Sequence, residues 1–278
     1  MRKCLIVVTT YKESSTSLGD DIARYLHEHG VACTFYQFDG NGAAENHFAG
    51  NDFVVTLGGD GTVLFAARGC ACLGIPVFPV NLGEFGFIAS IEKTEWECAL
   101  AQFLDGDARI DERNMIHATL SRQSFSAVAL NDIVISAETA ACAISFDVSY
   151  NDMSLGTFKA DGVIISTATG STAYSASAGG PIIDPELDAI VLTTVNAFSL
   201  SSRPLVLHPD GTIGITILPS RDRSMILTVD GQKPVPLKVG DSITIRRAPH
   251  KVKLVGCTAE KFYGALRSKL NWSGGPHA

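Results

Sequence analysis

The feature that most constrains the fold is a change of pattern near residue 108. Before it, short apolar runs typical of buried strands alternate with segments of helical spacing. The apolar runs cover residues 5–8, 31–38, 53–57 and 76–80, and the helical segments cover residues 18–26, 63–72 and 94–104. Strands that alternate with helices are joined by right-handed crossovers, so we predict an α/β domain with a mostly parallel sheet over residues 1–108.

After Asp105-Gly106-Asp107 the chain consists mainly of short β-type runs. They are separated by Asn-Asp, Asp-Gly and Gly-Asp pairs, which are typical of tight turns. The runs cover residues 115–120, 127–135, 144–150, 163–166, 190–194, 212–218, 225–229 and 242–245. We therefore predict an all-β domain over residues 109–258. A C-terminal segment, 259–278, follows, and we expect its helix over residues 260–270 to return to the first domain.

Composition argues against several classes of protein. Of the 278 residues, 46% are hydrophobic and 18% are charged, so the chain can bury a core and is not intrinsically disordered. The formal net charge of -7 argues against a general binder of nucleic acid or of anionic membranes. No apolar stretch reaches the roughly 18 residues that a membrane span needs. The N-terminal apolar run ends too early for a secretory signal, which makes it a first strand.

Cysteine and histidine residues show no metal-site pattern. The seven cysteines are scattered without a Cys-x-x-Cys pair, which favours reduced thiols and a cytoplasmic location. The seven histidines have neither metal-ligand spacing nor cysteine partners, so we expect no tightly bound structural metal. The sequence also lacks the Gly-x-Ser-x-Gly elbow of hydrolases.

The strongest local signal is Gly58-Gly59-Asp60-Gly61-Thr62, between an apolar strand and a predicted helix. Glycines let backbone approach a ligand closely, and a helix start offers free N–H groups, so the motif suits a pyrophosphate. It has neither the Gly-Lys-Ser/Thr ending of a Walker loop nor the Gly-x-Gly-x-x-Gly dinucleotide fingerprint. A carboxylate beside phosphate is repulsive unless it binds a metal or accepts a proton, which makes Asp60 a candidate functional group. A tight Gly/Asp turn is the alternative of equal weight.

A second signal is the long run from Asp161 to Pro181. Between Ser166 and Ser177 every residue is Ser, Thr, Gly or Ala, apart from Tyr174. Small residues admit a ligand, hydroxyls and amides can hydrogen-bond it, and the tyrosine offers an aromatic face. We favour a ligand site that opens a helix near residue 172 over a Ser/Thr-rich loop with a single cap.

Four weaker signals have plain structural explanations. Asn131-Asp132 interrupts a strand and could bind a ribose, although a turn or bulge is as well supported. Asp230-Gly231-Gln232 is by itself a hairpin turn. The segment from Asn81 to Phe87 follows a strand and could line a pocket or be a simple loop. Lys159 is more often a solvated charge than a ligand contact.

Taken together, these segments resemble the NAD kinase family. The glycine motif at 58–62, Asn81 with Gly86-Phe87, Asn131-Asp132, and the segments 161–181, 202–206 and 262–270 occur in the order and spacing of that family. The resemblance covers about residues 54–272. The Gly-Gly-Asp-Gly-Thr piece is shared with diacylglycerol-type lipid kinases and is similar to that of phosphofructokinases. The run 161–181 is far more specific and favours the NAD kinases.

The resemblance implies both a fold and an activity. The fold is an N-terminal α/β domain and a C-terminal β domain with a ligand cleft between them. The activity is transfer of the γ-phosphoryl group of ATP, or of a phosphoryl group of polyphosphate, to the 2′-hydroxyl of the adenosine ribose of NAD. It requires a divalent cation, for which we expect Mg²⁺. Family members are homo-oligomers, so we expect a dimer or tetramer in which a site can borrow residues from a neighbouring subunit.

Position by position, Asp60 resembles the catalytic base of the family and Asp161 its nicotinamide-side carboxylate. The positions that resemble NAD- or ATP-binding positions are Gly59, Gly61, Thr62, Phe87, Asn131, Asp132, Lys159, Asp161, Thr169, Thr172, Ala173, Tyr174, Ser175, Ser177, Asn196 and Gln232. Two residues depart from the family pattern. Asp132 stands where Glu is most common, which shortens the reach of the carboxylate, and Ala168 stands where Pro is usual.

Two other functions stay open at this point. A lipid kinase would share the glycine motif, but the sequence offers no apolar or basic segment for docking on a membrane. A non-catalytic module that senses NAD or NADP would bind the dinucleotide without transferring phosphate, and the presence of Asp60 argues against it.

Overall fold

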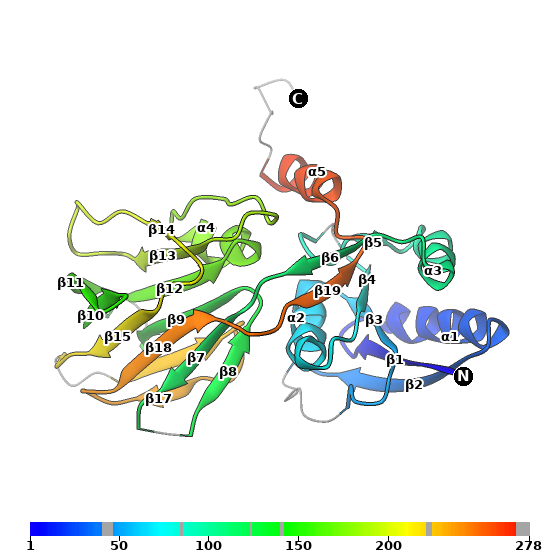
Figure 1. Cartoon of the computed structure of the whole chain (residues 1–278), viewed down its shortest axis with the longest axis horizontal. Coiled ribbons are helices and arrows are strands. Elements are labelled where there is room, and N and C mark those ends of the chain that lie inside the picture. Colours follow the sequence, from blue (N-terminus) through cyan, green and yellow to red (C-terminus); the bar gives the residue numbers. More distant parts are fainter. Residues whose placement is uncertain (41–46, 84–85, 123, 140–141, 221–223, 271–278) are drawn as a thin grey trace. The chain divides into compact units, whose positions relative to one another are not determined.

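The computed structural model describes residues 1–40, 47–83, 86–122, 124–139, 142–220 and 224–270. The chain divides into two compact units (Figure 1). The first comprises Met1–Arg113 together with His250–Ala278, and the second comprises Asn114–Pro249. The chain therefore leaves the first unit once and returns to it for its C-terminal segment.

The first unit contains a mostly parallel sheet, as predicted. Its described strands are β1 (Arg2–Thr9), β2 (Val31–Phe38), β3 (Phe53–Gly58), β4 (Val77–Asn81), β5 (Ile91–Glu92), β6 (Ile110–Arg113) and β19 (Val252–Val255). They are arranged in the order β2-β1-β3-β4-β19-β6, with β5 paired to β4. All of these pairs are parallel except β19 with β6.

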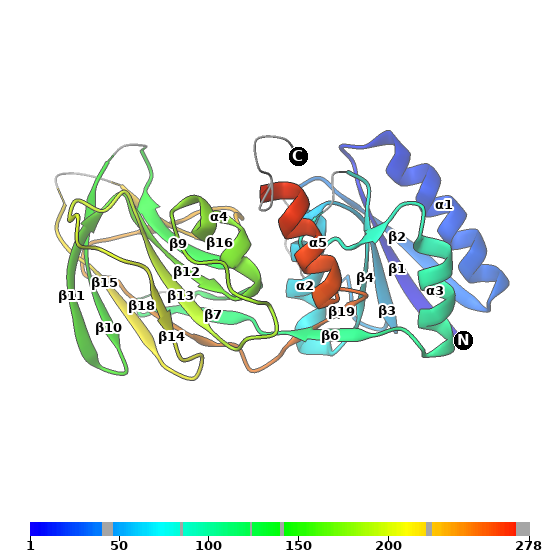
Figure 2. The same cartoon turned by 90° about the horizontal axis from the view of Figure 1, so that it is seen from above.

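Helices cover both faces of this sheet. They are α1 (Glu13–Glu28), α2 (Asp60–Cys70) with the 3₁₀ turn η1 (Ala71–Leu73), α3 (Trp96–Asp105) and α5 (Ala259–Leu270). Figures 1 and 2 show α1 and α3 on one face and α2 on the other. Ile6 of β1, Ile22 of α1 and Leu100 of α3 are fully buried in one cluster. On the opposite face, Phe65 of α2 stacks on Phe38 with ring centroids 4.5 Å apart.

The strand order places a switch point between β1 and β3. From β1 the chain crosses to β2 on one side, and from β3 it crosses through α2 to β4 on the other side. The loops that leave the carboxyl ends of β1 and β3 therefore diverge. In open α/β sheets, ligands bind outside the carboxyl ends of the strands at such a point.

The second unit consists of two antiparallel sheets. In the described residues their orders are β11-β10-β15-β18-β7-β8 and β14-β13-β12-β9-β16-β17. The strands are β7 (Ile116–Leu120), β8 (Ser126–Ala129), β9 (Asp132–Ala137), β10 (Ile144–Tyr150), β11 (Met153–Ala160), β12 (Gly162–Thr167), β13 (Ile190–Val195), β14 (Leu205–Leu207), β15 (Ile213–Ile217), β16 (Met225–Val229), β17 (Val235–Leu237) and β18 (Ser242–Arg247). The 3₁₀ turn η2 (Thr169–Thr172) and the short helix α4 (Tyr174–Ser177) follow β12.

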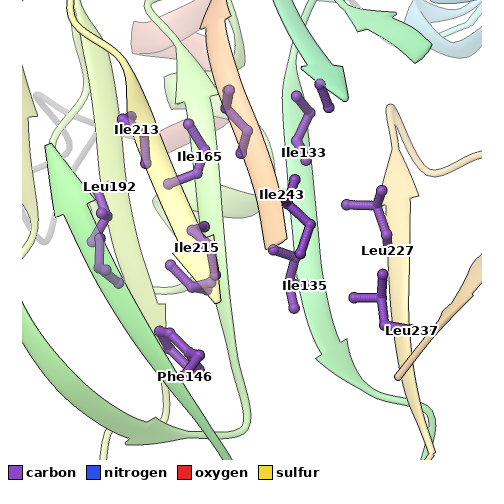
Figure 3. Close-up of a cluster of buried hydrophobic side chains, with 14 of the residues drawn as sticks. Ile133, Ile135, Phe146, Ile165, Leu192, Ile213, Ile215, Leu227, Leu237 and Ile243 are labelled. Atoms are coloured by element: carbon purple, nitrogen blue, oxygen red, sulfur yellow. The ribbon is translucent and has the colours of Figure 1, made fainter. Parts of the chain in front are cut away.

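One apolar core lies between these two sheets. Alternate residues of each strand point inward, as the two-residue period of a strand requires. Figure 3 shows Ile133 and Ile165 from one sheet with Phe146, Ile215 and Ile243 from the other. All five of these side chains are fully buried. This core fixes the register of β9 and β12, whose ends carry the candidate site residues Asn131, Asp132 and Asp161.

The structure confirms the fold class, including the return of the C-terminal helix to the first unit. Some boundaries differ from the prediction. The helix expected from residue 63 begins at Asp60, and the single run expected over 127–135 is split into β8 and β9 at Leu130-Asn131. Residues 110–113 and 252–255, which we had assigned to the β domain, form strands of the first sheet. The exposed edge strand β11 was not predicted, because its outward residues interrupt any apolar pattern.

We expect Ile165→Ala to destabilise the second unit by about 2–5 kcal/mol, because the side chain is fully buried and its removal leaves a cavity. The measurement is chemical denaturation followed by circular dichroism. Leu187→Ala is the matched control, since Leu187 is 59% exposed and should change stability by less than about 0.5 kcal/mol. Equal effects of the two substitutions would contradict this assignment of the core.

Candidate functional site

The carboxylate of Asp60 is held by three consecutive backbone amides. Asp60 is the first residue of α2, directly after the N-cap Gly59. Its Oδ1 accepts hydrogen bonds from the N–H groups of Ile88, at 3.2 Å, and Ala89, at 2.9 Å, and its Oδ2 accepts one from Phe87, at 3.1 Å. Hydrogen bonds to an ionised acceptor are stronger than neutral ones. The carboxylate is therefore fixed at the carboxyl edge of the sheet.

The glycines around Asp60 have two different roles. A Cβ added to Gly86 would lie 2.2 Å from Asp60 Oδ1, and one added to Gly58 would lie 2.1 Å from Thr62 Oγ1. These two glycines are needed for packing. A Cβ on Gly59 or Gly61 would meet no described atom within 4 Å, and both residues are exposed. The protein itself does not require glycine at 59 and 61, which leaves their backbone open to a ligand.

Residues from the part of the chain that returns to the first unit at His250 contact the loop that is hydrogen-bonded to Asp60. The thiol of Cys257 donates to the carbonyl of Ile88 at 3.2 Å and lies 3.2 Å from Ser90 Oγ. Burial raises the pKa of Cys257 to about 11, so this group stays a protonated donor. Lys261 Nζ donates to the Ser90 carbonyl at 2.9 Å.

The ring of Phe87 packs on helix α5. Its centroid lies 5.9 Å from that of Phe262, and the ammonium of Lys269 lies 5.0 Å above it. Phe87 was predicted as a substrate contact. In this structure its N–H group bonds Asp60 while its side chain anchors the loop to α5.

A second aspartate in the other unit repeats the arrangement. Oδ2 of Asp230 accepts the N–H of Leu130 at 3.0 Å, and its Oδ1 accepts those of Asn131, at 2.8 Å, and Asp132, at 3.2 Å. Asp230 has φ +47° and the following Gly231 has φ +65°, so the predicted hairpin turn between β16 and β17 is tight. Gln232 Nε2 donates to the Asp230 carbonyl at 3.3 Å. The turn thus holds Asp230, which Gln232 contacts, against Asn131 and Asp132.

Asp132 is a buried acid next to this fixed carboxylate. Its side chain is only 6% exposed. Burial, and secondarily the negative charge of Asp230, raise the pKa of Asp132 from 3.8 to about 7. Near neutral pH this group therefore changes between an acid that can donate a hydrogen bond and a carboxylate that can only accept.

The start of the hydroxyl-rich run packs directly on Asn131. Thr167 N donates to the Asn131 carbonyl at 2.9 Å, and Thr167 Oγ1 donates to the Leu130 carbonyl at 2.5 Å. Gly170 N donates to Thr167 Oγ1 at 3.0 Å. A Cβ on Gly170 would lie 2.0 Å from the Asn131 carbonyl oxygen, so only glycine fits. Two segments that are far apart in the sequence are therefore in direct contact.

The predicted ligand residues of the run differ in exposure. Thr169 is buried within η2, while Thr172 and Ala173 are half-buried. Tyr174 is 46% exposed at the start of α4, and Ser177 is exposed at its end. Ser175 is fully buried and lies 3.0 Å from Thr193 Oγ1, so its hydroxyl anchors α4 to β13.

The remaining predicted residues form a cluster at the opposite end of β12. Asn196 Nδ2 donates to Asp161 Oδ2 at 3.0 Å, and Asp161 N donates to the Val195 carbonyl at 2.9 Å. The ammonium of Lys159 lies 5.0 Å above the ring of Phe198. We call Lys159, Asp161 and Asn196 the Asp161 cluster, and Asn131, Asp132 and Gln232 the Asn131 cluster.

The two clusters are well separated within one chain. β9 and β12 are antiparallel, with Ser166 opposite Asp132 and Gly162 opposite Ser136. The Asn131 cluster therefore lies at one end of β12 and the Asp161 cluster at the other. Six residues of strand between them correspond to about 20 Å.

Four residues that position the site were missed by the sequence analysis. Lys12 follows the first apolar run and was given no role, and Asp230 was assigned only to a turn. Thr167 lay in the hydroxyl-rich run without being named as a ligand residue, and Cys257 was one of seven scattered thiols. The Asp-Gly pair at 230–231 carried a usable signal, since an aspartate in a tight turn often accepts backbone N–H groups. The other three act through contacts between distant segments, which no local pattern reveals.

The described residues contain neither a metal-ligand cluster nor a helix that could span a membrane. Among them, no group of three or more His, Cys, Asp or Glu is placed to hold a metal ion. No helix in the same part of the chain is long and apolar enough to cross a membrane. All seven cysteines are free thiols.

Comparison with known proteins gives consistent matches along the chain. Residues 8–108 match the ATP-NAD kinase N-terminal domain, and residues 130–257 match the ATP-NAD kinase C-terminal domain. A protein named NAD kinase from Treponema denticola is 47% identical over 277 residues, which are 99% of this chain and 98% of that protein. A second, from Treponema pallidum, is 44% identical over 275 residues, covering 98% of this chain and 90% of that protein.

Two solved structures share the fold. Yeast NADH kinase complexed with NADH aligns with a TM-score of 0.87 at 24% identity, covering 99% of this chain and 89% of that one. An NAD kinase from Archaeoglobus fulgidus in complex with ATP aligns with a TM-score of 0.80 at 24% identity, covering 96% of this chain and 99% of that one.

Asp132 should make stability depend on pH. Because its folded pKa is raised to about 7, the native state binds the proton more tightly than the unfolded chain. The stabilisation is full below about pH 4 and is lost as the pH rises through 7. In the wild type, the free energy of unfolding measured by urea titration should fall by about 1–3 kcal/mol between pH 5 and pH 8 because of this group. We expect Asp132→Asn to abolish this fall. The exposed Asp152→Asn is the control, and identical pH profiles for wild type and Asp132→Asn would refute the assignment.

Proposed function

This chain belongs to the NAD kinase family, and from that premise we propose that it transfers a phosphoryl group to the 2′-hydroxyl of the adenosine ribose of NAD, which makes NADP. The donor is ATP, through its γ-phosphoryl group, or polyphosphate. Domain matches over residues 8–108 and 130–257 support the activity. We place the reaction in the cytoplasm, where seven free thiols would stay reduced.

The observation that carries the mechanism is the amide-bound carboxylate of Asp60. A carboxylate offers about four acceptor positions on its two oxygens. Three are filled by the N–H groups of residues 87–89, two on Oδ1 and one on Oδ2. Oδ2 keeps a lone pair for the ribose hydroxyl. Asp60 is thus an oriented base that can take a proton at one defined atom.

The protein contributes mainly positioning and charge neutralisation to this reaction, and little covalent chemistry. The 2′-oxygen forms a bond to the transferred phosphorus, the bond to the bridging oxygen of the donor breaks, and the hydroxyl proton passes to Asp60. The transition state for such transfer is loose in most analyses, so positioning and charge neutralisation dominate. The exposed backbone at Gly59 and Gly61 is suited to close approach by donor phosphates.

We propose Mg²⁺ as the divalent cation, carried chiefly by the donor phosphates. Such ions keep few protein carboxylates and bind mainly through substrate phosphates and water. When bound, the ion would offset negative charge on the phosphates.

The second unit is proposed to bind NAD. The Asn131 cluster would contact the adenosine ribose, with Thr169 and residues 172–177 against the adenosine. Asp161 would meet the nicotinamide side. Because the two clusters lie about 20 Å apart along β12, we propose a homo-oligomer, a dimer or tetramer, in which neighbouring protomers complete each other's sites. Exposed apolar side chains near the Asp161 cluster support such contacts: Leu155, Phe198 and Leu200.

We expect Asp60→Asn to lower kcat by about 10²–10⁴-fold, because the base is lost. The asparagine oxygen can still accept the N–H groups of Ile88 and Ala89, so the fold and the affinity for NAD should persist. The assay measures NADP formed from NAD, Mg²⁺ and either ATP or polyphosphate. Asp52→Asn is the control, since Asp52 also accepts a backbone N–H, from Lys3 at 2.6 Å, far from the glycine loop. Near-normal turnover by Asp60→Asn would overturn the base assignment.

We expect Asp161→Ala to raise the KM for NAD about tenfold, because a charge-assisted hydrogen bond to the nicotinamide side is lost. The donor KM should change little. Asp147→Ala is the matched control in the same unit, since the Asp147 carboxylate accepts a hydrogen bond from the exposed Thr157 hydroxyl, at 2.5 Å. An unchanged KM for NAD in Asp161→Ala would remove Asp161 from the site.

A further inference from the structure

We propose that Lys12 binds the phosphate tail of the phosphoryl donor. The donor would then lie across the carboxyl edge of the first sheet, between the loops that follow β1 and β3. This inference rests on the proposed function and deepens it, because it assigns a protein cation to a reaction whose substrates are strongly anionic.

Lys12 lies at the switch point of the sheet. β1 ends at Thr9, and Lys12 is the N-cap residue of α1. β1 pairs in parallel with β3, with Val8 opposite Leu57. Lys12 and the glycine motif therefore leave neighbouring strands at the same edge, where the chain crosses in opposite directions. That position is the usual ligand crevice of an open α/β sheet.

The ammonium contacts the loop that is hydrogen-bonded to the glycine motif. Lys12 Nζ donates to the Leu82 carbonyl at 3.0 Å, and Leu82 N donates to the Gly58 carbonyl at 3.0 Å. A Cβ on Gly83 would come within 2.5 Å of Nζ, so glycine at this position leaves room for the ammonium. Two hydrogen bonds thus connect the charge of Lys12 to the residue that opens the Gly-Gly-Asp-Gly-Thr motif.

The backbone of Lys12 is fixed before any ligand binds. Ser15 Oγ lies 2.6 Å from the Thr9 carbonyl oxygen and 2.7 Å from that of Lys12, and its one hydrogen is shared between them. Ser15 N also donates to the Lys12 carbonyl, at 3.0 Å. Ser15 is fully buried. A cation on a preorganised loop loses less conformational entropy on binding than one on a free surface chain.

The charge of Lys12 has no carboxylate partner in the part of the chain that the structure describes. The residue is half-buried, and its one hydrogen-bond acceptor there is the Leu82 carbonyl. An ammonium has three N–H donors, and the described residues account for one of them. A partly desolvated cation without a counterion favours binding of an anion.

Space for an anion adjoins these contacts. A pocket of about 350 Å³ is lined by Asn81, Leu82, Gly83, Glu92, Lys93 and Thr94. It shares Leu82 and Gly83 with the contacts of Lys12. Lys93 on its wall offsets the charge of Glu92, and the ammonium of Lys12 adds a positive charge next to the pocket. A chain of phosphates is the ligand class that fits a fixed ammonium beside exposed glycine backbone.

The test compares Lys12→Met, which removes the charge, with Lys12→Gln, which keeps an N–H donor for the Leu82 carbonyl. Steady-state assays give separate KM values for the donor, as Mg²⁺-ATP or polyphosphate, and for NAD. We expect both variants to raise the donor KM about tenfold or more, with the KM for NAD changed less than about twofold. Lys12→Arg should restore most of the donor affinity.

The matched control is Lys3→Met, because Lys3 lies at the opposite end of β1. It should leave both KM values near those of the wild type. A donor KM unchanged in Lys12→Gln, or raised no more than the KM for NAD, would overturn the inference. A wild-type protein that forms no NADP from either donor would instead refute the proposed function. Thermal melting of each variant separates loss of binding from loss of folding.

Discussion

The proposed site in the first unit depends on three hydrogen bonds, which consecutive backbone N–H groups donate to the Asp60 carboxylate. The N–H groups of residues 87–89 converge on one side chain at the start of α2. Gly86 must lack a Cβ for this approach. The carboxylate thereby acquires a fixed orientation beside a glycine loop whose exposed backbone is free to meet phosphate. A mobile aspartate at the same place would lose the positioning on which phosphoryl transfer depends.

The same device occurs in the second unit, where the Asp230 carboxylate accepts the N–H groups of residues 130–132. In each unit, an aspartate at a turn or helix start binds a segment far away in the sequence. The two aspartates have different roles. Asp60 lies at a glycine loop and keeps an acceptor position, whereas Asp230 is buried and orients Asn131 and Asp132. Cys257 and Lys261 belong to the part of the chain that returns to the first unit at His250. They donate hydrogen bonds to the carbonyls of Ile88 and Ser90, in the loop that holds Asp60.

Local sequence patterns predicted the fold class and the two main motifs because strand alternation, glycine turns and helix spacing are local properties. Apolar runs located β2 and β3 closely, and the Asp-Gly pair located the turn after β16. They could not reveal that Thr167 bonds Leu130 or that Cys257 bonds Ile88, since those contacts join distant segments. The family resemblance placed Phe87 among the ligand contacts, and the structure adds that its N–H group bonds Asp60 and its ring packs on α5. The separation of the Asp161 and Asn131 clusters became apparent only from the register of β9 and β12.

Hydrogen exchange read by mass spectrometry tests the hydrogen bonds to Asp60 most directly. The amides of Phe87, Ile88 and Ala89 should exchange slowly in the wild-type protein, because each donates to Asp60, and much faster in Asp60→Ala. A peptide from β9, in the other unit, should exchange at the same rate in both proteins. If residues 86–90 exchanged equally fast with and without the carboxylate, the loop would not be held by Asp60. The account of an oriented base would then be wrong.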